Sequence, residues 1–490
     1  MSPDSKQTDL LIRNATLIDG TGAPARSGGL AVRDDRIVAL GDLDGWQGAK
    51  DIDAGGKVLA PGFIDVHTHD DRALIANPTM DCKVSQGVTT VVTGNCGVSL
   101  APLAIDRRPP PPLDLISEKP EGFFADFAGY LDFLDKEPPA TNALAQVGHS
   151  SLRAGTLDSL DRPATGDEVA TMRHRLEQSL EAGAIGLSTG LFYPPAMAAP
   201  TEEVIELAKA LHQARALHTT HMRDEADHVI DSLGETFRIG REAQVPVVIS
   251  HHKCAGQANY GRSVETLALI DATRGQQHIG LDVYPYVAGS TMLDSGRLMG
   301  ASKVLVTWSV PHPDATGRDL KDIAADWGVD VEEAVSRLTP AGGIFFMMDE
   351  ADVQRILAYP HSMIGSDGLP HDSHPHPRLW GTFPRVLGHY SRDLQLFSLE
   401  EAVRKMTGLP ASEFGLSDRG RLAVGAAADL VLFDPDEVID AATFEAPKTP
   451  ARGILEVWVN GRSVWRDGAT TGARPGRALR LQSLTLPSAA

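Results

Sequence analysis

Cysteine and positive charge are both scarce in this chain of 490 residues. Only three cysteines occur, Cys82, Cys96 and Cys254, and their odd number and wide spacing indicate neither a disulfide framework nor a Cys-x-x-Cys site. Lysine and arginine number 45 against 65 acidic residues, which gives a formal net charge of −20. Because nucleic acids and anionic membranes bind clustered positive charge, we expect no nucleic-acid partner and no membrane partner.

Long apolar runs are also missing from the sequence. No segment approaches the roughly 18 apolar residues that a membrane-spanning helix requires. The first ten residues, MSPDSKQTDL, are polar and charged, without the apolar stretch of a secretory leader. We therefore expect a cytoplasmic protein with a small-molecule partner, either a monomer or a small homo-oligomer.

The middle of the chain repeats a strand-then-helix rhythm, which is typical of a parallel sheet. The predicted strands end at 66–67, 91–92, 145–147, 185–187, 218–220, 247–249, 281–283 and 363–364. Amphipathic helices are predicted at 167–181, 202–215 and 227–242. Eight such units indicate a TIM-like (β/α)8 barrel, since the Gly-rich first turn of a doubly wound sheet is missing.

Segments of short strands and turns flank this middle part. We predict that residues 1–61 and 415–490 together form a small β-sandwich domain, with the catalytic barrel at 62–414. The connection after the seventh strand far exceeds the usual two to six residues. It is interpreted as an inserted subdomain at about 287–350, with a helical stretch at 319–338.

Side chains that can bind metals follow several predicted strands at the same end. His67 and His69 are two residues apart on a strand, so both rings lie on one face and can converge on one ion. His221, His251 and Asp367 follow later strands, and unrelated core histidines would not all fall at strand ends. Because this end of a barrel carries the active site, the pattern predicts a metal centre, and neutral imidazoles suit zinc.

Two further features have competing interpretations. Cys96 follows the second strand, where its thiolate could bridge two metals, although a free cysteine is commonly a small buried apolar residue. Residues 186–190, Gly-Leu-Ser-Thr-Gly, match the nucleophile elbow of serine hydrolases. That elbow needs a helix directly after the serine, and the paired prolines Pro194 and Pro195 prevent a prompt start. We favour the metal centre.

Four segments carry a family resemblance. They are Phe-Ile-Asp-Val-His-Thr-His at 63–69, Asn-Cys-Gly at 95–97, Ser-His-His-Lys at 250–253 and Gly-Ser-Asp-Gly-Leu-Pro-His at 365–371. Together they resemble the N-acyl-D-amino-acid deacylases, or D-aminoacylases, of the amidohydrolase superfamily. The likeness runs from near residue 8 to past residue 470.

The resemblance implies one tightly bound zinc ion and a possible second, weaker metal position. The implied ligands are Cys96, His221 and His251 for the first, and His67, His69 and Asp367, with Cys96 shared, for the second. Zinc lowers the pKa of a bound water toward about 7. The expected catalytic residues are Asp367, which takes the water proton and returns it to the departing amine, and His67, which helps to stabilise the oxyanion.

The resemblance also implies the substrate, an N-acyl-D-amino acid hydrolysed to a carboxylate and a D-amino acid. Its free α-carboxylate requires cations, and the family likeness suggests Lys253 and Arg378 with Tyr284 and Tyr193. For Arg378 the alternative is a loop salt bridge. A barrel scaffold without catalysis is a further alternative, but such scaffolds usually lack several ligands, and this chain has a complete set.

The preferred side chain is the least constrained part of this interpretation. Apolar residues near the predicted mouth favour broad specificity for apolar side chains, although each could instead pack in the core. These candidates are Phe192, Leu298, Phe345, Phe346, Met347 and Met348. The alternative is an N-acyl-D-glutamate or N-acyl-D-aspartate deacylase in which Arg297 pairs with the acidic side chain.

Overall fold

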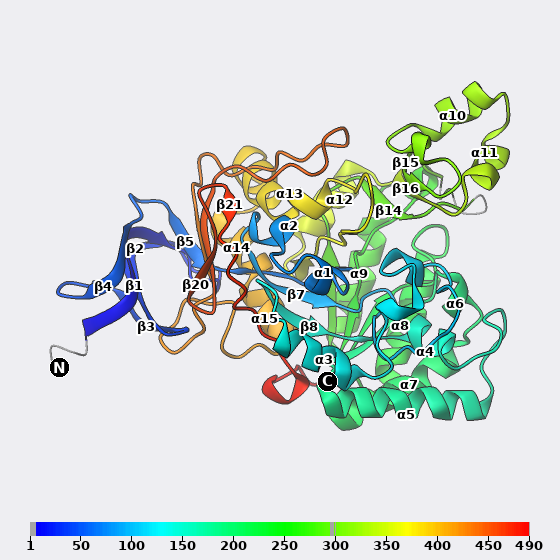
Figure 1. The fold of residues 1–490 in the computed structure, drawn as a ribbon, viewed down its shortest axis with the longest axis horizontal. Coiled ribbons are helices and arrows are strands. Elements are labelled where there is room, and N and C mark those ends of the chain that lie inside the picture. The colour runs from blue at the N-terminus through cyan, green and yellow to red at the C-terminus, as the bar shows by residue number, and fades with distance from the viewer. Residues whose placement is uncertain (1–5, 295–297, 299, 490) are drawn as a thin grey trace.

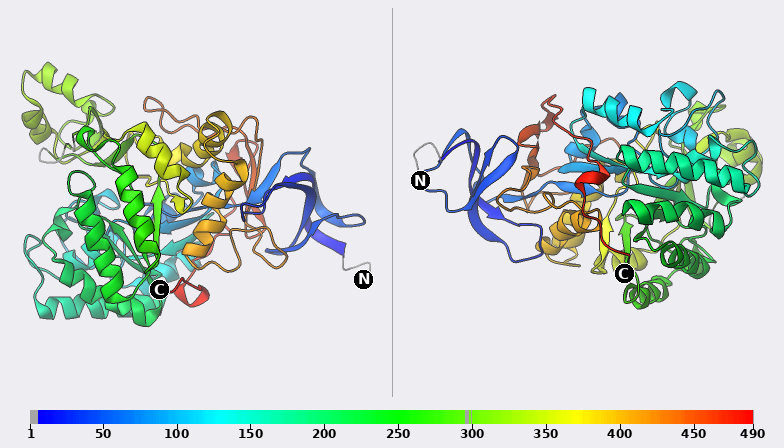
Figure 2. Two further views of the ribbon diagram at one scale, coloured as in Figure 1. Left: turned by 180° about the vertical axis from the view of Figure 1, so that it is seen from behind. Right: turned by 90° about the horizontal axis from the view of Figure 1, so that it is seen from below.

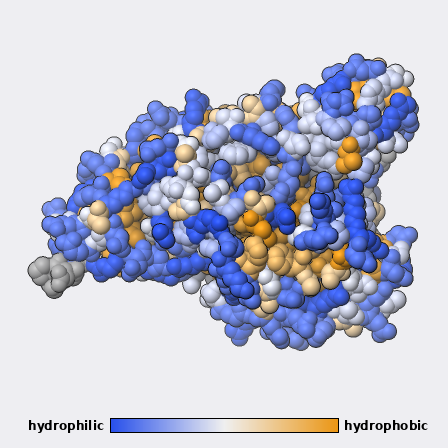
Figure 3. Space-filling model, in the orientation of Figure 1, coloured by the Kyte–Doolittle hydropathy of each residue, from blue (hydrophilic) through white to orange (hydrophobic). Residues whose placement is uncertain are grey.

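The structure is a computed structural model that describes residues 6–294, 298 and 300–489. A β-rich part lies at the end of the molecule that holds the N-terminus, an α/β part forms the middle, and a small subdomain projects at the far end (Figure 1). Polar residues cover most of the visible face, with smaller apolar areas between them (Figure 3). No helix among the described residues is long and apolar enough to cross a membrane.

Parallel strands form the centre of the α/β part. They are β6 (Phe63–Asp65), β7 (Val88–Thr93), β8 (Asn142–Ala145), β9 (Val147–Gly148), β10 (Gly186–Gly190), β11 (Leu217–His221), β12 (Val247–Ile249), β13 (Ile279–Val283) and β17 (Ser362–Ile364). Regular pairing gives a three-stranded sheet, β6-β7-β8, and a six-stranded sheet, β17-β13-β12-β11-β10-β9. Taking β8 and β9 as one strand interrupted at Gln146, the described residues contain the eight predicted strand positions in TIM-barrel-like order.

The first and last of these strands meet without a regular ladder. A single parallel bridge joins Thr68 to Gly368, and the Asp367 amide donates to the His67 carbonyl at 2.7 Å. The two sheets therefore approach each other at the point where two of the predicted metal ligands lie.

Helices cover the outer side of these strands (Figure 2). They include α1 (Ala73–Ala76), α2 (Asp81–Val84), α3 (Phe127–Lys136), α4 (His149–Ala154), α5 (Gly166–Ala182), α6 (Pro194–Met197), α7 (Thr201–Ala214), α8 (Val229–Ala243), α9 (Ser263–Arg274), α12 (Glu350–Ala358), α13 (Arg378–Arg385), α14 (Leu399–Met406) and α15 (Gly408–Glu413). The three predicted helices agree with α5, α7 and α8 to within two residues. Local signals explain such bounds: Thr165 and Glu168 form a capping box at the start of α5, and Gly183, with a φ of 123°, ends it.

The strands at the two ends of the chain share one sheet. They are β1 (Gln7–Leu17), β2 (Arg26–Arg33), β3 (Arg36–Gly41), β4 (Gln47–Asp53), β5 (Val58–Pro61), β18 (Leu430–Phe433), β19 (Ile454–Val459), β20 (Arg462–Arg466) and β21 (Ala469–Thr470). The N-terminal and C-terminal halves join where β5 pairs antiparallel with β18. Leu10, Ile12, Leu30, Leu430 and Trp458 belong to a separate apolar cluster in this part. The domain boundaries at 61 and 415 remain predictions.

The long connection after β13 folds into more than the predicted helical stretch. It contains an antiparallel sheet in the order β14 (Ala288–Met292), β16 (Ala341–Phe346) and β15 (Lys303–Ser309). Two helices, α10 (Leu320–Trp327) and α11 (Val331–Leu338), lie between β15 and β16 in the chain. The predicted helical stretch at 319–338 is present, but as two helices separated at residues 328–330. Gly328 adopts a left-handed φ of 64° that ends α10, and the Asp330 side chain then caps α11 by accepting from the Glu333 amide.

Candidate metal centre

The six predicted metal ligands come together at the carboxyl ends of the barrel strands. They form two groups, and within each group all ligand atoms lie within 4.8 Å of one another. The first group is His67, His69, Cys96 and Asp367, and the second is Cys96, His221 and His251. Cys96 belongs to both groups and is therefore placed to be shared.

Close contacts link the two groups. The Cys96 Sγ lies 3.2 Å from His67 Nε2 and 3.4 Å from His251 Nε2. The Asp367 Oδ1 lies 3.2 Å from His69 Nε2 and 3.5 Å from His67 Nε2. All of these side chains are buried, so their charges interact in a medium of low dielectric.

Backbone strain is concentrated at this point. Cys96, His251 and Asp367 have left-handed φ values of 53°, 36° and 50°. For residues with a β-carbon this conformation costs on the order of 1–3 kcal/mol and persists where the surrounding structure imposes it. Three strained residues among six candidate ligands therefore indicate a functional constraint.

Cys96 and Asp367 are held in the charged forms that bind metal ions. Burial alone raises the pKa of the Cys96 thiol, but His67 and His251 outweigh it and hold this pKa well below its ordinary value. Burial likewise raises the pKa of Asp367, but Arg378, His251 and His67 outweigh it and hold this pKa well below the usual range. The group therefore offers a thiolate and a carboxylate, the forms that bind metal ions.

His221 provides a test of whether a metal fits. Burial lowers the pKa of His221, which favours the neutral imidazole. Its Nδ1 is buried and has no hydrogen-bond partner among the described residues, which costs free energy that a bound ligand would recover. The other three rings differ, because burial lowers the pKa values of His67, His69 and His251 but their anionic neighbours outweigh it and raise these values, to about 9 for His69. A bound metal would have to displace these protons, and the deprotonated rings with the buried thiolate form a donor set that zinc accepts.

Two buried carboxylates that the sequence reading missed support the histidines. Asp282 lies with Oδ2 3.3 Å from His67 Nδ1, and its Oδ1 accepts the His251 amide at 2.9 Å. Glu225 lies 3.0 Å from His251 Nδ1 and accepts from Lys253 Nζ at 2.8 Å. Carboxylates that hold the second ring nitrogen fix the orientation of metal-binding histidines. An acidic residue within an apolar strand was the signal for Asp282.

The four predicted substrate-binding residues surround the metal group. Arg378 is buried, its Nη2 lies 2.9 Å from Asp367 Oδ2, and its guanidinium lies 4.6 Å from the Tyr284 ring centre. Its Nε and Nη1 are buried without a partner among the described residues. Lys253 is already paired with Glu225. Tyr193 lies with its ring centre 4.9 Å from that of His221.

The apolar candidates divide between the site and the core. The Phe192 ring stacks on His221 with centroids 5.4 Å apart, and Met348 lines a small cavity with Lys253 and Tyr284. Phe345 is fully buried in the main hydrophobic core. Arg297 lies outside the described residues.

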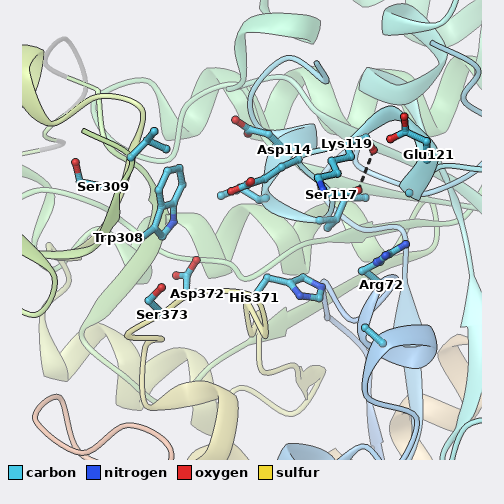
Figure 4. A pocket seen from close by; sticks show the side chains of 16 residues that line it. Arg72, Asp114, Ser117, Lys119, Glu121, Trp308, Ser309, His371, Asp372 and Ser373 are labelled. Atoms are coloured by element: carbon cyan, nitrogen blue, oxygen red, sulfur yellow. Dashed lines mark hydrogen bonds between the residues drawn. The ribbon is translucent and has the colours of Figure 1, made fainter. Parts of the chain in front are cut away.

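A small hollow at the metal group and a larger cavity share one lining residue. The small hollow is lined by His69, Cys96 and Asp367, and Leu115 lines both it and the larger cavity of about 590 Å³. Figure 4 shows Trp308, from β15, and Asp372 on one side of the larger cavity.

Comparison with known proteins gives the family. Residues 50–298 and 316–465 match the amidohydrolase family. Over 476 residues the chain is 56% identical to a D-aminoacylase of Alcaligenes xylosoxydans xylosoxydans, which spans 97% of this chain and 98% of that protein. An N-acyl-D-aspartate deacylase of the same organism is 55% identical over 476 residues, 96% of this chain and 95% of that one.

A solved structure agrees with these sequences. The N-acyl-D-glutamate deacylase of Bordetella bronchiseptica, complexed with zinc and a phosphonate inhibitor that mimics the reaction tetrahedral intermediate, superposes with a TM-score of 0.94. Its identity is 47%, over 97% of this chain and 100% of that one. The resemblance seen in the sequence is thereby confirmed: the chain belongs to the amidohydrolase family, as a hydrolytic enzyme of the D-aminoacylase group.

Proposed function

We propose that this chain uses zinc to hydrolyse N-acyl-D-amino acids to a carboxylate and a D-amino acid. The observation that carries the proposal is the buried Asp367–Arg378 pair beside the shared Cys96. It combines a base for the reacting atoms with a cation that can bind the substrate carboxylate.

Two sets of residues would hold the metal. Cys96, His221 and His251 would hold the tight ion, and His67, His69 and Asp367, with Cys96 shared, the weaker one. When bound, zinc supplies a Lewis acid that polarises the amide carbonyl and acidifies water.

Asp367 is the proposed general base and acid. Its carboxylate is ionised, because Arg378 and the neighbouring histidines outweigh its burial and depress its pKa. It therefore accepts the proton of the attacking water at Oδ1 or Oδ2 and delivers it to the amide nitrogen, which leaves poorly unless it is protonated. His67 contacts Asp282 through Nδ1 and the Asp367 carboxylate through Nε2, and it helps to stabilise the oxyanion.

Arg378 is the principal proposed anchor of the substrate carboxylate. Its Nε and Nη1 have no partner among the described residues and can each donate a hydrogen bond to a bound ligand, Nη1 from the edge of the guanidinium that it shares with Nη2. Tyr284 stacks on the guanidinium and limits its movement, while Lys253 and Tyr193 complete the proposed carboxylate-binding side. Lys253 already forms an ion pair with Glu225, so we expect it to contribute less than Arg378 to binding of the substrate carboxylate.

Broad specificity for apolar side chains is the leading proposal for the substrate side chain, supported by the apolar surfaces of Phe192 and Met348 beside the site. The acidic alternative, with Arg297 as the binding residue, is supported by the nearly equal identities to a D-aminoacylase and an N-acyl-D-aspartate deacylase.

The test compares hydrolysis rates of N-acetyl-D-methionine, N-acetyl-L-methionine, N-acetyl-D-glutamate and N-acetyl-D-aspartate, with zinc content measured on the same sample. We expect D-methionine to be released fastest and L-methionine slowest. Faster release of D-glutamate or D-aspartate, lost in Arg297→Leu, would establish the alternative. Turnover that survives both chelation and Cys96→Ala would exclude the metal mechanism.

A further inference from the structure

A fully buried lysine lies next to the metal group without being a candidate ligand. Lys83, on α2, donates from Nζ to Asp65 Oδ2 and to Ser366 Oγ, both at 2.8 Å. The same nitrogen lies 3.3 Å from Asp70 Oδ2. The ammonium group therefore makes two hydrogen bonds and a further ion pair with Asp70, whose carboxylate oxygens have no hydrogen-bond partner among the described residues. All three neighbouring residues are fully buried.

The partners of Lys83 lie where the barrel closes. Asp65 is the last residue of β6, and Ser366 follows the end of β17. Asp65 also accepts the Ser366 amide at 2.8 Å through its other oxygen. Because only an isolated bridge joins these strand ends among the described residues, the Lys83 ammonium replaces part of the missing ladder.

Each partner is a chain neighbour of a second-position ligand. Asp65 precedes His67 by two residues, Asp70 directly follows His69, and Ser366 directly precedes Asp367. Among the described residues, Lys83 makes no hydrogen bond or ion pair with a chain neighbour of His221 or His251. The ammonium therefore braces one half of the metal centre and not the other.

We propose that Lys83 is a positioning residue that sets the spacing of His67, His69 and Asp367, and so controls metal affinity at the second position. The assignment of that position rests on the proposed function. The chain also offers a matched control. Lys405 is equally buried and donates to the carbonyls of Tyr359 and Ser362, at the opposite end of β17.

The experiment measures zinc stoichiometry and affinity of the full chain in buffers of fixed free zinc, for the wild type, Lys83→Met and Lys405→Met. For Lys83→Met we expect the tight ion to be retained, the second ion to bind about 10–100-fold more weakly, and kcat to fall more than KM changes. For Lys405→Met we expect lower folding stability with second-ion affinity unchanged. Ser366→Ala removes one acceptor, leaves the ion pairs in place and should shift the second affinity in the same direction by less; it is the variant to use if Lys83→Met does not fold.

Equal second-ion affinity in the wild type and in Lys83→Met, or in Ser366→Ala where Lys83→Met does not fold, would overturn the proposal. So would a wild type that binds a single zinc ion at every concentration. Failure of the proposed function is a separate result: the wild type would bind two zinc ions but would not hydrolyse N-acetyl-D-methionine. The zinc affinities of the wild type and Lys83→Met would still test the role of Lys83.

Discussion

At the scale of single residues, Arg378 joins two parts of the site. It lowers the pKa of Asp367, and two of its buried donors have no partner in the part of the chain that the structure describes. An unpartnered buried guanidinium nitrogen is costly without a ligand. Arg378 does form a salt bridge, as the alternative interpretation expects, but its partner is the candidate base Asp367.

We predict that Arg378→Lys will lower kcat/KM for N-acetyl-D-methionine mainly by raising KM. Lysine keeps the positive charge but cannot place separate donors at the Nε and Nη1 positions, and hydrogen bonds to charged groups contribute about 1.5–3 kcal/mol, or roughly ten- to 150-fold. Steady-state kinetics measure this. Arg385→Lys is the control, since Arg385 lies at the end of the same helix but contacts Tyr286 and Tyr390. An unchanged KM in Arg378→Lys would show that another residue binds the carboxylate.

At the scale of elements, the close approach of β17 to β6 requires a glycine. A β-carbon at Gly365 would lie 2.5 Å from the His67 Cβ and 2.9 Å from Asp282 Oδ1. Both atoms are buried and constrained by the barrel, so a side chain there must displace His67.

We predict that Gly365→Ala will lower kcat by about a hundredfold, since a displacement of about 1 Å at a reacting group can have an effect of that size. Activity assays at saturating zinc measure it. Gly166→Ala is the matched control, because a β-carbon there meets nothing within 4 Å and alanine is favoured in a helix. Similar activity in the two variants would mean that His67 tolerates displacement.

Elements were predictable where a local pattern determines them. The strand ends that carry His67, Cys96 and Asp367 were visible because apolar runs end at polar residues. The sheet β14-β16-β15 was missed, since the glycines of β16, Gly342 and Gly343, interrupt the alternation that marks a strand.

At the scale of the whole molecule, buried neutral histidines make folding stability depend on pH. Burial lowers the pKa of His218 to about 4, from an ordinary value of 6.5. The unfolded chain therefore takes up a proton below pH 6.5 that the folded chain does not. Stability that is present above pH 6.5 is lost as the pH falls from 6.5 toward 4, by about 3 kcal/mol at most from this residue.

We predict that His218→Gln will flatten the fall of unfolding free energy between pH 6.5 and 4. Denaturant titrations at several pH values measure it, and His228→Gln, which changes an exposed histidine, should leave the slope as in the wild type. A slope unchanged by His218→Gln would mean that this histidine takes up protons equally in the folded and unfolded chains.

The sequence by itself determined the strand order, the placement of metal-binding side chains at strand ends and the family resemblance, because each depends on residues close together in the chain. Only the tertiary structure decided which groups hold those side chains in place. Asp282 lies 215 residues from His67, and Ser366 lies 283 residues from Lys83. Such contacts form only when the barrel closes, because that brings strands from opposite ends of the domain together and buries their charges side by side. No local pattern records them.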